Sequence, residues 1–181
     1  VINDTASRQG TSEVAGGLAG GLLSARAFAG TQGYDQTFSA VSADRTSEDL
    51  NRRQRVPTRS SGTAAQWVRP FGRHTLLVGA EAKFIKGDTR GTQLSAGRVL
   101  ATLNNGGTQR VWSTFIQDTF LVSDRLTVVV GAHGDQWHTR SQNTSYNKTL
   151  GSFNPRASLA HRLGRGFLLR GSAYKGFRPP T

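Results

Sequence analysis

Residues 123–135 read SDRLTVVVGAHGD, a short polar turn followed by a segment whose side chains alternate in character. Every second position is apolar, at Leu126, Val128, Val130 and Ala132. The positions between them are mostly small or polar, at Thr127, Val129, Gly131, His133 and Asp135. A period of two predicts an extended strand with one apolar face and one wet face.

The same unit of alternating strand, tight turn and alternating strand occurs four times. The tight turns are predicted at Leu18-Ala19-Gly20-Gly21, Phe71-Gly72-Arg73-His74, Ser123-Asp124-Arg125 and Gly164-Arg165-Gly166. Long polar connections are predicted around 41–56, 89–108 and 141–152. The eight strands between them are predicted at 8–18, 22–40, 57–70, 75–88, 109–122, 126–140, 153–163 and 167–177. Short turns at one end and long loops at the other are typical of an outer-membrane β-barrel, so the fold class is all-β and antiparallel.

Composition agrees with this membrane architecture. Only 35% of residues are hydrophobic, and no run approaches the eighteen apolar residues of a helical span. A barrel needs apolar side chains only on its lipid face, which leaves a mixed composition, although a soluble β-sandwich alternates in the same way. Aromatic residues lie near the tight turns and near the long loops, as two interfacial girdles would: Trp67, Phe71, Phe120 and Phe167, then Phe84, Trp112 and Trp137.

The carboxyl-terminal residues carry the most specific local signal. The segment Tyr174-Lys175-Gly176-Phe177-Arg178-Pro179-Pro180-Thr181 resembles a mid-barrel segment of TonB-dependent outer-membrane receptors, with Gly176, Phe177, Arg178 and Pro180 as the motif residues. Three earlier segments resemble the preceding family strands in the family's order: 115–118 (FIQD), 123–127 (SDRLT) and 153–160 (FNPRASLA). The resemblance is strongest over 109–181. The first thirty or so residues match by pattern only.

The resemblance implies that residues 1–181 are a partial barrel domain, about eight strands of a barrel of about twenty-two whose lumen holds a plug. Both chain ends are expected on the long-loop side, which also favours a fragment. The implied partners are outer-membrane lipid and lipopolysaccharide, the receptor's own plug and, through the plug, TonB. The implied function is active uptake of a scarce ligand, most often a ferric siderophore, with cobalamin, haem or a carbohydrate open. The alternative is a small complete barrel acting as an adhesin, anchor or passive pore.

A net charge of +12 favours an anionic partner. The arginines Arg45, Arg52, Arg53 and Arg55 cluster in the first long connection, where they predict either a basic vestibule for an anionic ligand or a rim that meets lipopolysaccharide phosphates. Alternation places further candidates on the lumen face: Glu81, Lys83, His133, Asp135, Arg156 and Arg170, with Tyr174 in the last strand. Their mixed charges favour a network that braces the wall or contacts the plug over direct ligand contact.

Catalysis, a metal site and a cofactor have no support in the sequence. His133 and Asp135 share one strand face, but His138 lies on the other, and two ligands do not make a site. The Gly164-Arg165-Gly166 turn lacks the third glycine and the helix of a dinucleotide-binding loop. Nucleic-acid binding is disfavoured as well, because the charges are scattered and no recognition helix accompanies them.

Overall fold

The computed structural model describes residues 3–164 and 166–177 of the chain and consists of eight antiparallel strands. They are β1 (Asn3–Leu18), β2 (Gly21–Val41), β3 (Glu48–Phe71), β4 (His74–Ser95), β5 (Arg98–Ser123), β6 (Leu126–Ser141), β7 (Asn147–Gly164) and β8 (Phe167–Tyr174). Each strand pairs with the next in a meander of order β1 to β8. The prediction of an all-β, eight-stranded antiparallel fold is confirmed.

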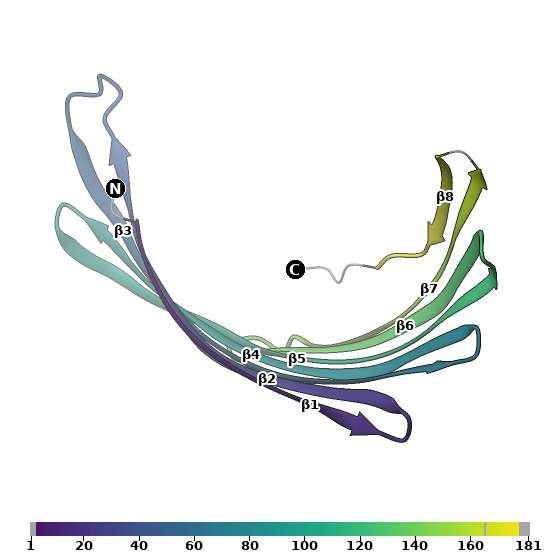
Figure 1. Ribbon diagram of the computed structural model, residues 1–181. Coiled ribbons are helices and arrows are strands. Elements are labelled where there is room, and N and C mark those ends of the chain that lie inside the picture. The colour runs from purple at the N-terminus through teal and green to yellow at the C-terminus, as the bar shows by residue number, and fades with distance from the viewer. Residues whose placement is uncertain (1–2, 165, 178–181) are drawn as a thin grey trace.

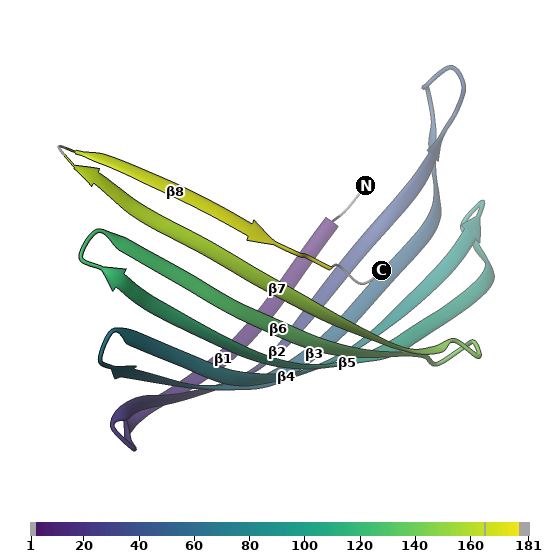
Figure 2. The same ribbon diagram turned by 90° about the vertical axis from the view of Figure 1, so that its right-hand side faces the viewer.

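The sheet curves into an open trough, with the short turns at one end and the longer hairpins at the other (Figure 1). Seen from the side, the strands lie next to one another and form part of a barrel wall (Figure 2). Within the described residues β1 pairs only with β2 and β8 only with β7, so these eight strands do not close into a ring. No helix in the described residues has the length and apolar character to cross a bilayer.

The tight turns lie where the sequence predicts them. The first turn places Ala19 and Gly20 at φ values of 49° and 73°, the left-handed pair that suits a two-residue hairpin. The second and third turns lie at 72–73 and 124–125. In the fourth, Gly164 and Gly166 both have φ of 92°, and Arg165 lies outside the described residues.

The prediction of long loops is wrong at all three places. β3 begins at Glu48, β4 continues to Ser95 and β5 begins at Arg98, so the connections are only 42–47, 96–97 and 142–146. The predicted strand starts at 8, 57, 109 and 153 are therefore late, and the predicted end at 177 lies past Tyr174. These hairpins rise beyond the apolar band, where both faces meet water. The alternation is lost there while the hydrogen-bonded ladder continues.

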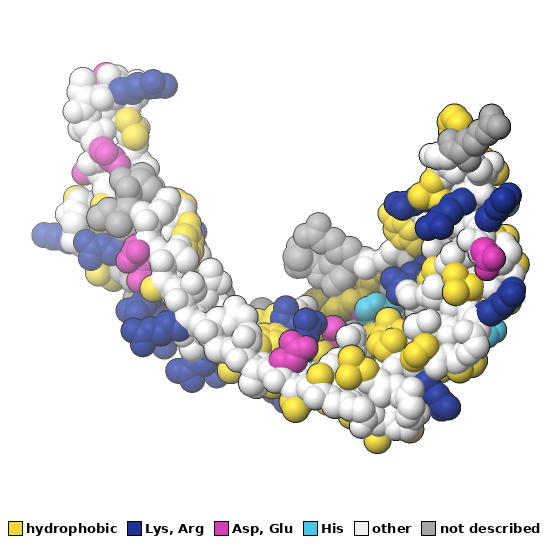
Figure 3. Space-filling model, in the orientation of Figure 1, with side chains coloured by type: hydrophobic (Ala, Val, Ile, Leu, Met, Phe, Trp, Pro, Cys, Tyr) yellow, Lys and Arg dark blue, Asp and Glu magenta, His cyan; other side chains and the backbone are white. Residues whose placement is uncertain are grey.

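The strand register defines two faces, of which the concave one is polar. One row of directly opposed residues crosses seven strands and is named here the polar row: Glu13, Arg26, Ala64, Glu81, Ser113, Asp135 and Ser152. The described segment after β8 runs into the hollow, where the Phe177 ring lies 5.4 Å from that of Trp137. Acidic and basic side chains lie side by side on the floor of that hollow (Figure 3).

The convex face carries an apolar band between aromatic girdles. At the short-turn end the rings of Phe71, His74 and Phe120 stack in one row, with centroid distances of 5.2 and 4.4 Å. At the other end lie Phe84 and Trp112. The ten residue-to-residue steps from His74 to Phe84 span about 34 Å of strand, or about 26 Å of membrane thickness at a tilt of about 40°. That matches the apolar band of a membrane barrel.

One girdle assignment needs correction. Trp137 shares the concave face with His133 and Asp135, so it does not contact lipid. Its parity along β6 is opposite to that of the lipid-facing Val128 and Val130. Trp137 was predicted to belong to the girdle because it lies close to the end of its strand. The strand register, however, determines which face of the sheet its side chain occupies.

Candidate functional site

A cavity of about 530 Å³ lies on the concave face, with residues of β4 to β8 in its wall. It brings together four residues that the sequence predicts, which are Glu81, His133, Arg156 and Tyr174. Lys175, which the sequence reasoning missed, also lines it and is held by a 3.0 Å hydrogen bond from its backbone N–H to the Pro155 carbonyl. The cavity thus combines two cations, one carboxylate, an imidazole and a phenol.

Asp135 lies beside this cavity and is held by its neighbours. Its carboxylate accepts hydrogen bonds from Ser113 Oγ at 2.7 Å, Ser152 Oγ at 3.1 Å and Asn154 Nδ2 at 3.2 Å. His133 Nε2 lies 3.0 Å from Asp135 Oδ1, and the Asp135 side chain is only 10% exposed. These contacts join β5, β6 and β7, so the carboxylate braces the wall. The sequence did not predict Ser113, Ser152 and Asn154 as partners of Asp135, because the strand register decides which residues lie next to that carboxylate.

Arg156 reaches across β6 to the polar end of Gln117, to which its guanidinium donates a hydrogen bond. Gly131 lies between them in the register and makes this reach possible. A Cβ at Gly131 would meet the Ile116 carbonyl oxygen at 2.8 Å and Arg156 Nε at 3.3 Å. The small residue in the middle strand therefore orients the Arg156 head toward the cavity.

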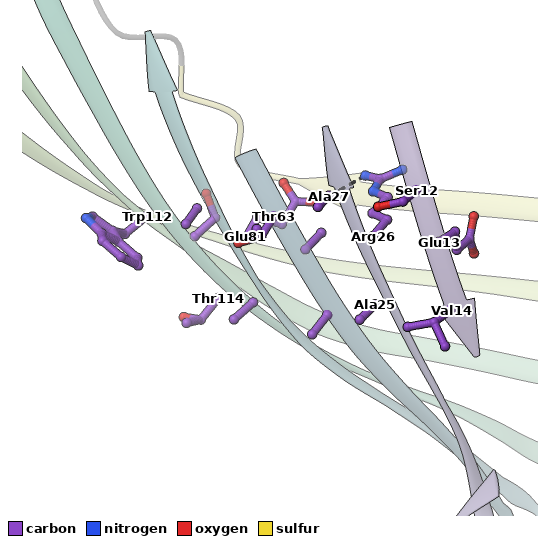
Figure 4. A pocket seen from close by; sticks show the side chains of 15 residues that line it. Ser12, Glu13, Val14, Ala25, Arg26, Ala27, Thr63, Glu81, Trp112 and Thr114 are labelled. Carbon is purple, nitrogen blue, oxygen red and sulfur yellow. Dashed lines mark hydrogen bonds and ion pairs between the residues drawn. The ribbon is translucent and has the colours of Figure 1, made fainter. Parts of the chain in front are cut away.

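Arg26 and Glu81 form a second cross-strand contact, in the polar row. Arg26 Nη2 lies 3.5 Å from Glu81 Oε1, across Ala64 of the strand between them (Figure 4). The two side chains are 67% and 45% exposed. Such an exposed pair contributes at most about 1 kcal/mol, and both groups stay available to a partner in the hollow.

The predicted arginine cluster of the first connection is divided between the two faces. Arg52 lies on the concave face with its guanidinium 5.5 Å from the Phe38 ring centre. Arg53 and Arg55 lie on the convex face, where Arg55 Nε is 3.5 Å from Asp35 Oδ1. Arg45 lies at the hairpin tip with φ of 59°. The four side chains do not line one vestibule.

The remaining predicted residues lie apart from the cavity. Lys83 is on the concave face of β4, two residues beyond Glu81. Arg170 is also concave and lines a neighbouring hollow of about 320 Å³. Of the family motif, Gly176 and Phe177 are described, whereas Arg178 and Pro180 lie outside the described residues.

The β2–β3 hairpin tip is ordered around Asp44. Its carboxylate accepts hydrogen bonds from Ser42 Oγ at 2.6 Å, Thr46 Oγ1 at 2.8 Å and the Thr46 backbone N–H at 3.2 Å. These donors lower the pKa of Asp44 from 3.8 to about 2. The tip therefore carries a fixed negative charge beside Arg45.

The side chains of the concave face are suited to binding a ligand. Within the described ranges, no group of three or more His, Cys, Asp or Glu side chains is placed to hold a metal ion. The polar concave face, the lipid-facing band and the two girdles together define the wall of a membrane-spanning β-barrel. The family model described as "TonB dependent receptor-like, beta-barrel" matches residues 4–181, and the chain belongs to this family.

Solved structures agree on the fold. The pyoverdine outer membrane receptor FpvA from Pseudomonas aeruginosa PAO1 superposes with a TM-score of 0.81 at 14% identity, over 94% of this chain and 29% of its own. The receptor Fiu from E. coli K12, named for ferric-catecholate import, gives 0.69 at 11% identity, over 98% and 36%. The copper transporter OprC gives 0.71 at 12% identity, over 87% and 28%. The search of curated proteins returned no match.

These comparisons confirm the suspected family and extend it to nearly the whole chain, including the first thirty residues, where the resemblance rested on pattern alone. The chain spans 25% to 29% of the length of the first FpvA structures it matches. Proteins of this family are outer-membrane transport receptors and not enzymes, so the predicted location and the absence of catalysis are confirmed.

Proposed function

We propose that this chain is part of the barrel wall of a TonB-dependent receptor that takes up a ferric siderophore or a similar anionic metal chelate. Several structural relatives are named for such ligands, among them pyoverdine, ferric catecholate and ferric citrate. OprC, named as a copper transporter, leaves other metal cargoes open.

The concave cavity carries this proposal. Arg156 and Lys175 supply positive charge, and Tyr174 and Phe115 supply aromatic surface within the same wall. Siderophore complexes combine anionic oxygen donors with flat aromatic or amide groups, which such a wall would hold by charge-assisted hydrogen bonds and stacking. Glu81 at the opposite side would limit how much negative charge the cavity accepts.

The plug would occupy the hollow that the trough begins to enclose. Glu13, Arg26 and Glu81 of the polar row point into this hollow from three strands. Arg26 and Glu81 are exposed enough to exchange their mutual contact for contacts with plug side chains. TonB would then act on the plug and not on this wall. A small complete barrel is the weaker candidate, because the eight described strands form an open sheet.

The test uses the full-length receptor in cells that lack its gene. Uptake of radiolabelled iron would be measured for a panel of ferric siderophores, with and without an uncoupler of the inner-membrane proton gradient. We expect uptake of one chelate class to return with the gene and to stop with the uncoupler. Gene-dependent uptake that survives the uncoupler would indicate a passive pore instead.

The cavity itself is tested by Arg156→Gln in the same receptor. Loss of one charge-assisted contact should raise the Kd for the transported chelate about 10-fold to 100-fold. Arg69→Gln is the matched control, because Arg69 lies on the convex face at the short-turn end, 5.8 Å from the Trp67 ring centre. An unchanged Kd in Arg156→Gln would exclude this cavity as the binding site.

A further inference from the structure

His133 lies in the wall of the concave cavity, where a ligand can reach it. Its ring packs edge-on against Phe115 of β5, with 6.0 Å between the ring centres and 70° between the ring planes. Its Nε2 lies 3.0 Å from Asp135 Oδ1, but this contact is not aligned as a hydrogen bond. The His133 side chain remains 44% exposed, so part of the imidazole is open to a molecule in the cavity.

Charged and titratable groups surround His133 from several strands. The side chains of β5 that line the cavity are uncharged, whereas β4, β6, β7 and β8 with the residue after it contribute ionisable ones. In and beside the cavity these are two cations, two carboxylates and a phenol: Arg156, Lys175, Glu81, Asp135 and Tyr174. Arg26 contacts Glu81 from outside the cavity wall, at 3.5 Å. Positive and negative groups are therefore close to balance, and one added charge on the imidazole changes what an anion meets there.

Histidine is the side-chain type of this group that ordinarily changes charge between about pH 5 and pH 8. A neutral imidazole donates one N–H, whereas an imidazolium donates from both ring nitrogens and carries a positive charge. An anion in the cavity therefore binds the protonated form of His133 more tightly than the neutral form. By thermodynamic linkage, the binding of such an anion takes up a proton from the solvent.

We propose that the concave cavity binds an anionic ferric chelate together with one proton, which a ring nitrogen of His133 takes up from the solvent. This inference rests on the proposed function and adds a regulation of the same site, because the affinity rises as the pH falls. The charged ring lies between two anions, with the Asp135 carboxylate 3.0 Å away on the wall side and the chelate on the cavity side. Three other donors hold Asp135, so the carboxylate keeps its place in both charge states of the ring.

The experiment measures binding to the purified full-length receptor in detergent, by calorimetry in phosphate and in Tris buffer. The probes are a ferric tricatecholate, a ferric hydroxamate–catecholate and ferric citrate, each titrated alone so that its own proton changes are subtracted. The two buffers differ in their enthalpy of ionisation, so the difference in heat counts the protons that binding takes up. We expect uptake of about half a proton to one proton near neutral pH, and a Kd about 10-fold lower at about pH 6 than at about pH 8.

Two substitutions of His133 separate the charge of the ring from its shape. His133→Gln removes the titration, so the Kd should change less than about twofold over this pH range and stay near the wild-type value at high pH. His133→Lys supplies a fixed cation at the same place, so the Kd should stay near the wild-type value at low pH throughout. Weaker binding in both variants with the wild-type pH dependence retained would show a merely structural role and overturn the proposal.

The matched control is His138→Gln, because His138 belongs to the same strand but lies on the convex face, with Nδ1 3.0 Å from Thr149 Oγ1. It should keep the wild-type pH dependence. Glu81→Gln should keep it as well while binding an anionic probe more tightly, and a flat pH profile in this variant would assign the proton to Glu81 and overturn the role of His133. Binding of a probe without proton uptake would overturn this inference and leave the proposed function standing, whereas no binding of any probe would overturn both.

Discussion

Replacing Asp135 by alanine removes the acceptor that joins three strands of the wall. The carboxylate is 10% exposed and accepts hydrogen bonds from Ser113, Ser152 and Asn154. A hydrogen bond to a charged group contributes about 1.5–3 kcal/mol, and donors left without a partner cost more. The three bonds are not additive, because they share one acceptor and the hydroxyl donors can turn to water. We therefore expect a loss of about 3–5 kcal/mol in the free energy of unfolding.

The assay is guanidinium unfolding of the full-length receptor in lipid vesicles, followed by tryptophan fluorescence. Asp135→Asn keeps one acceptor oxygen and should lose less, about 1–3 kcal/mol. Asp124→Ala is the matched control, because Asp124 lies in an exposed short turn, and it should change stability by less than about 0.5 kcal/mol. If Asp135→Ala unfolds at the same midpoint as Asp124→Ala, the bracing role assigned to Asp135 is wrong.

Because the pKa of Asp44 is lowered to about 2, the stabilisation that its carboxylate gives the hairpin tip is complete above about pH 4 and is lost as the pH falls through 2. A ¹³C NMR titration of the labelled Asp44 carboxyl carbon measures this pKa. A titration midpoint near 3.8 would contradict the prediction. Gly131→Val should push β6 away from the Ile116 carbonyl oxygen and lower the midpoint of guanidinium unfolding, whereas Gly10→Val, at an open position, should not. The isolated chain 1–181 should aggregate or remain protease-sensitive in detergent, since β1 and β8 each have one edge without a neighbouring strand in the described sheet. A heat-modifiable, protease-resistant monomer would refute this.

The candidate site was predictable in part. The period of two assigned Glu81, Lys83, His133, Asp135 and Arg156 to one face, and the structure places all five on the concave side. The same rule separates Arg52 from Arg53 and Arg55, although their closeness in sequence suggested one cluster. Parity along a strand is a local property, so it can be read from the residues themselves.

The partners of these residues could not be predicted in the same way. Ser113 and Ser152 meet Asp135 only because β5, β6 and β7 pair in one particular register. Arg59 and Lys86 likewise lie directly opposite one another through the strand register, although they are far apart in the chain.

The sequence by itself determined the strand class, the tight turns, the two faces of the strands and the family resemblance. Each depends on neighbouring residues: side-chain alternation, glycines that accept positive φ, and short motifs. Only the tertiary structure decided the length of the hairpins, because their polar outer parts lack alternation, and which residues lie opposite one another. A shift of one residue in register would exchange the faces of a whole strand, and it is the packing of the complete wall that fixes that register.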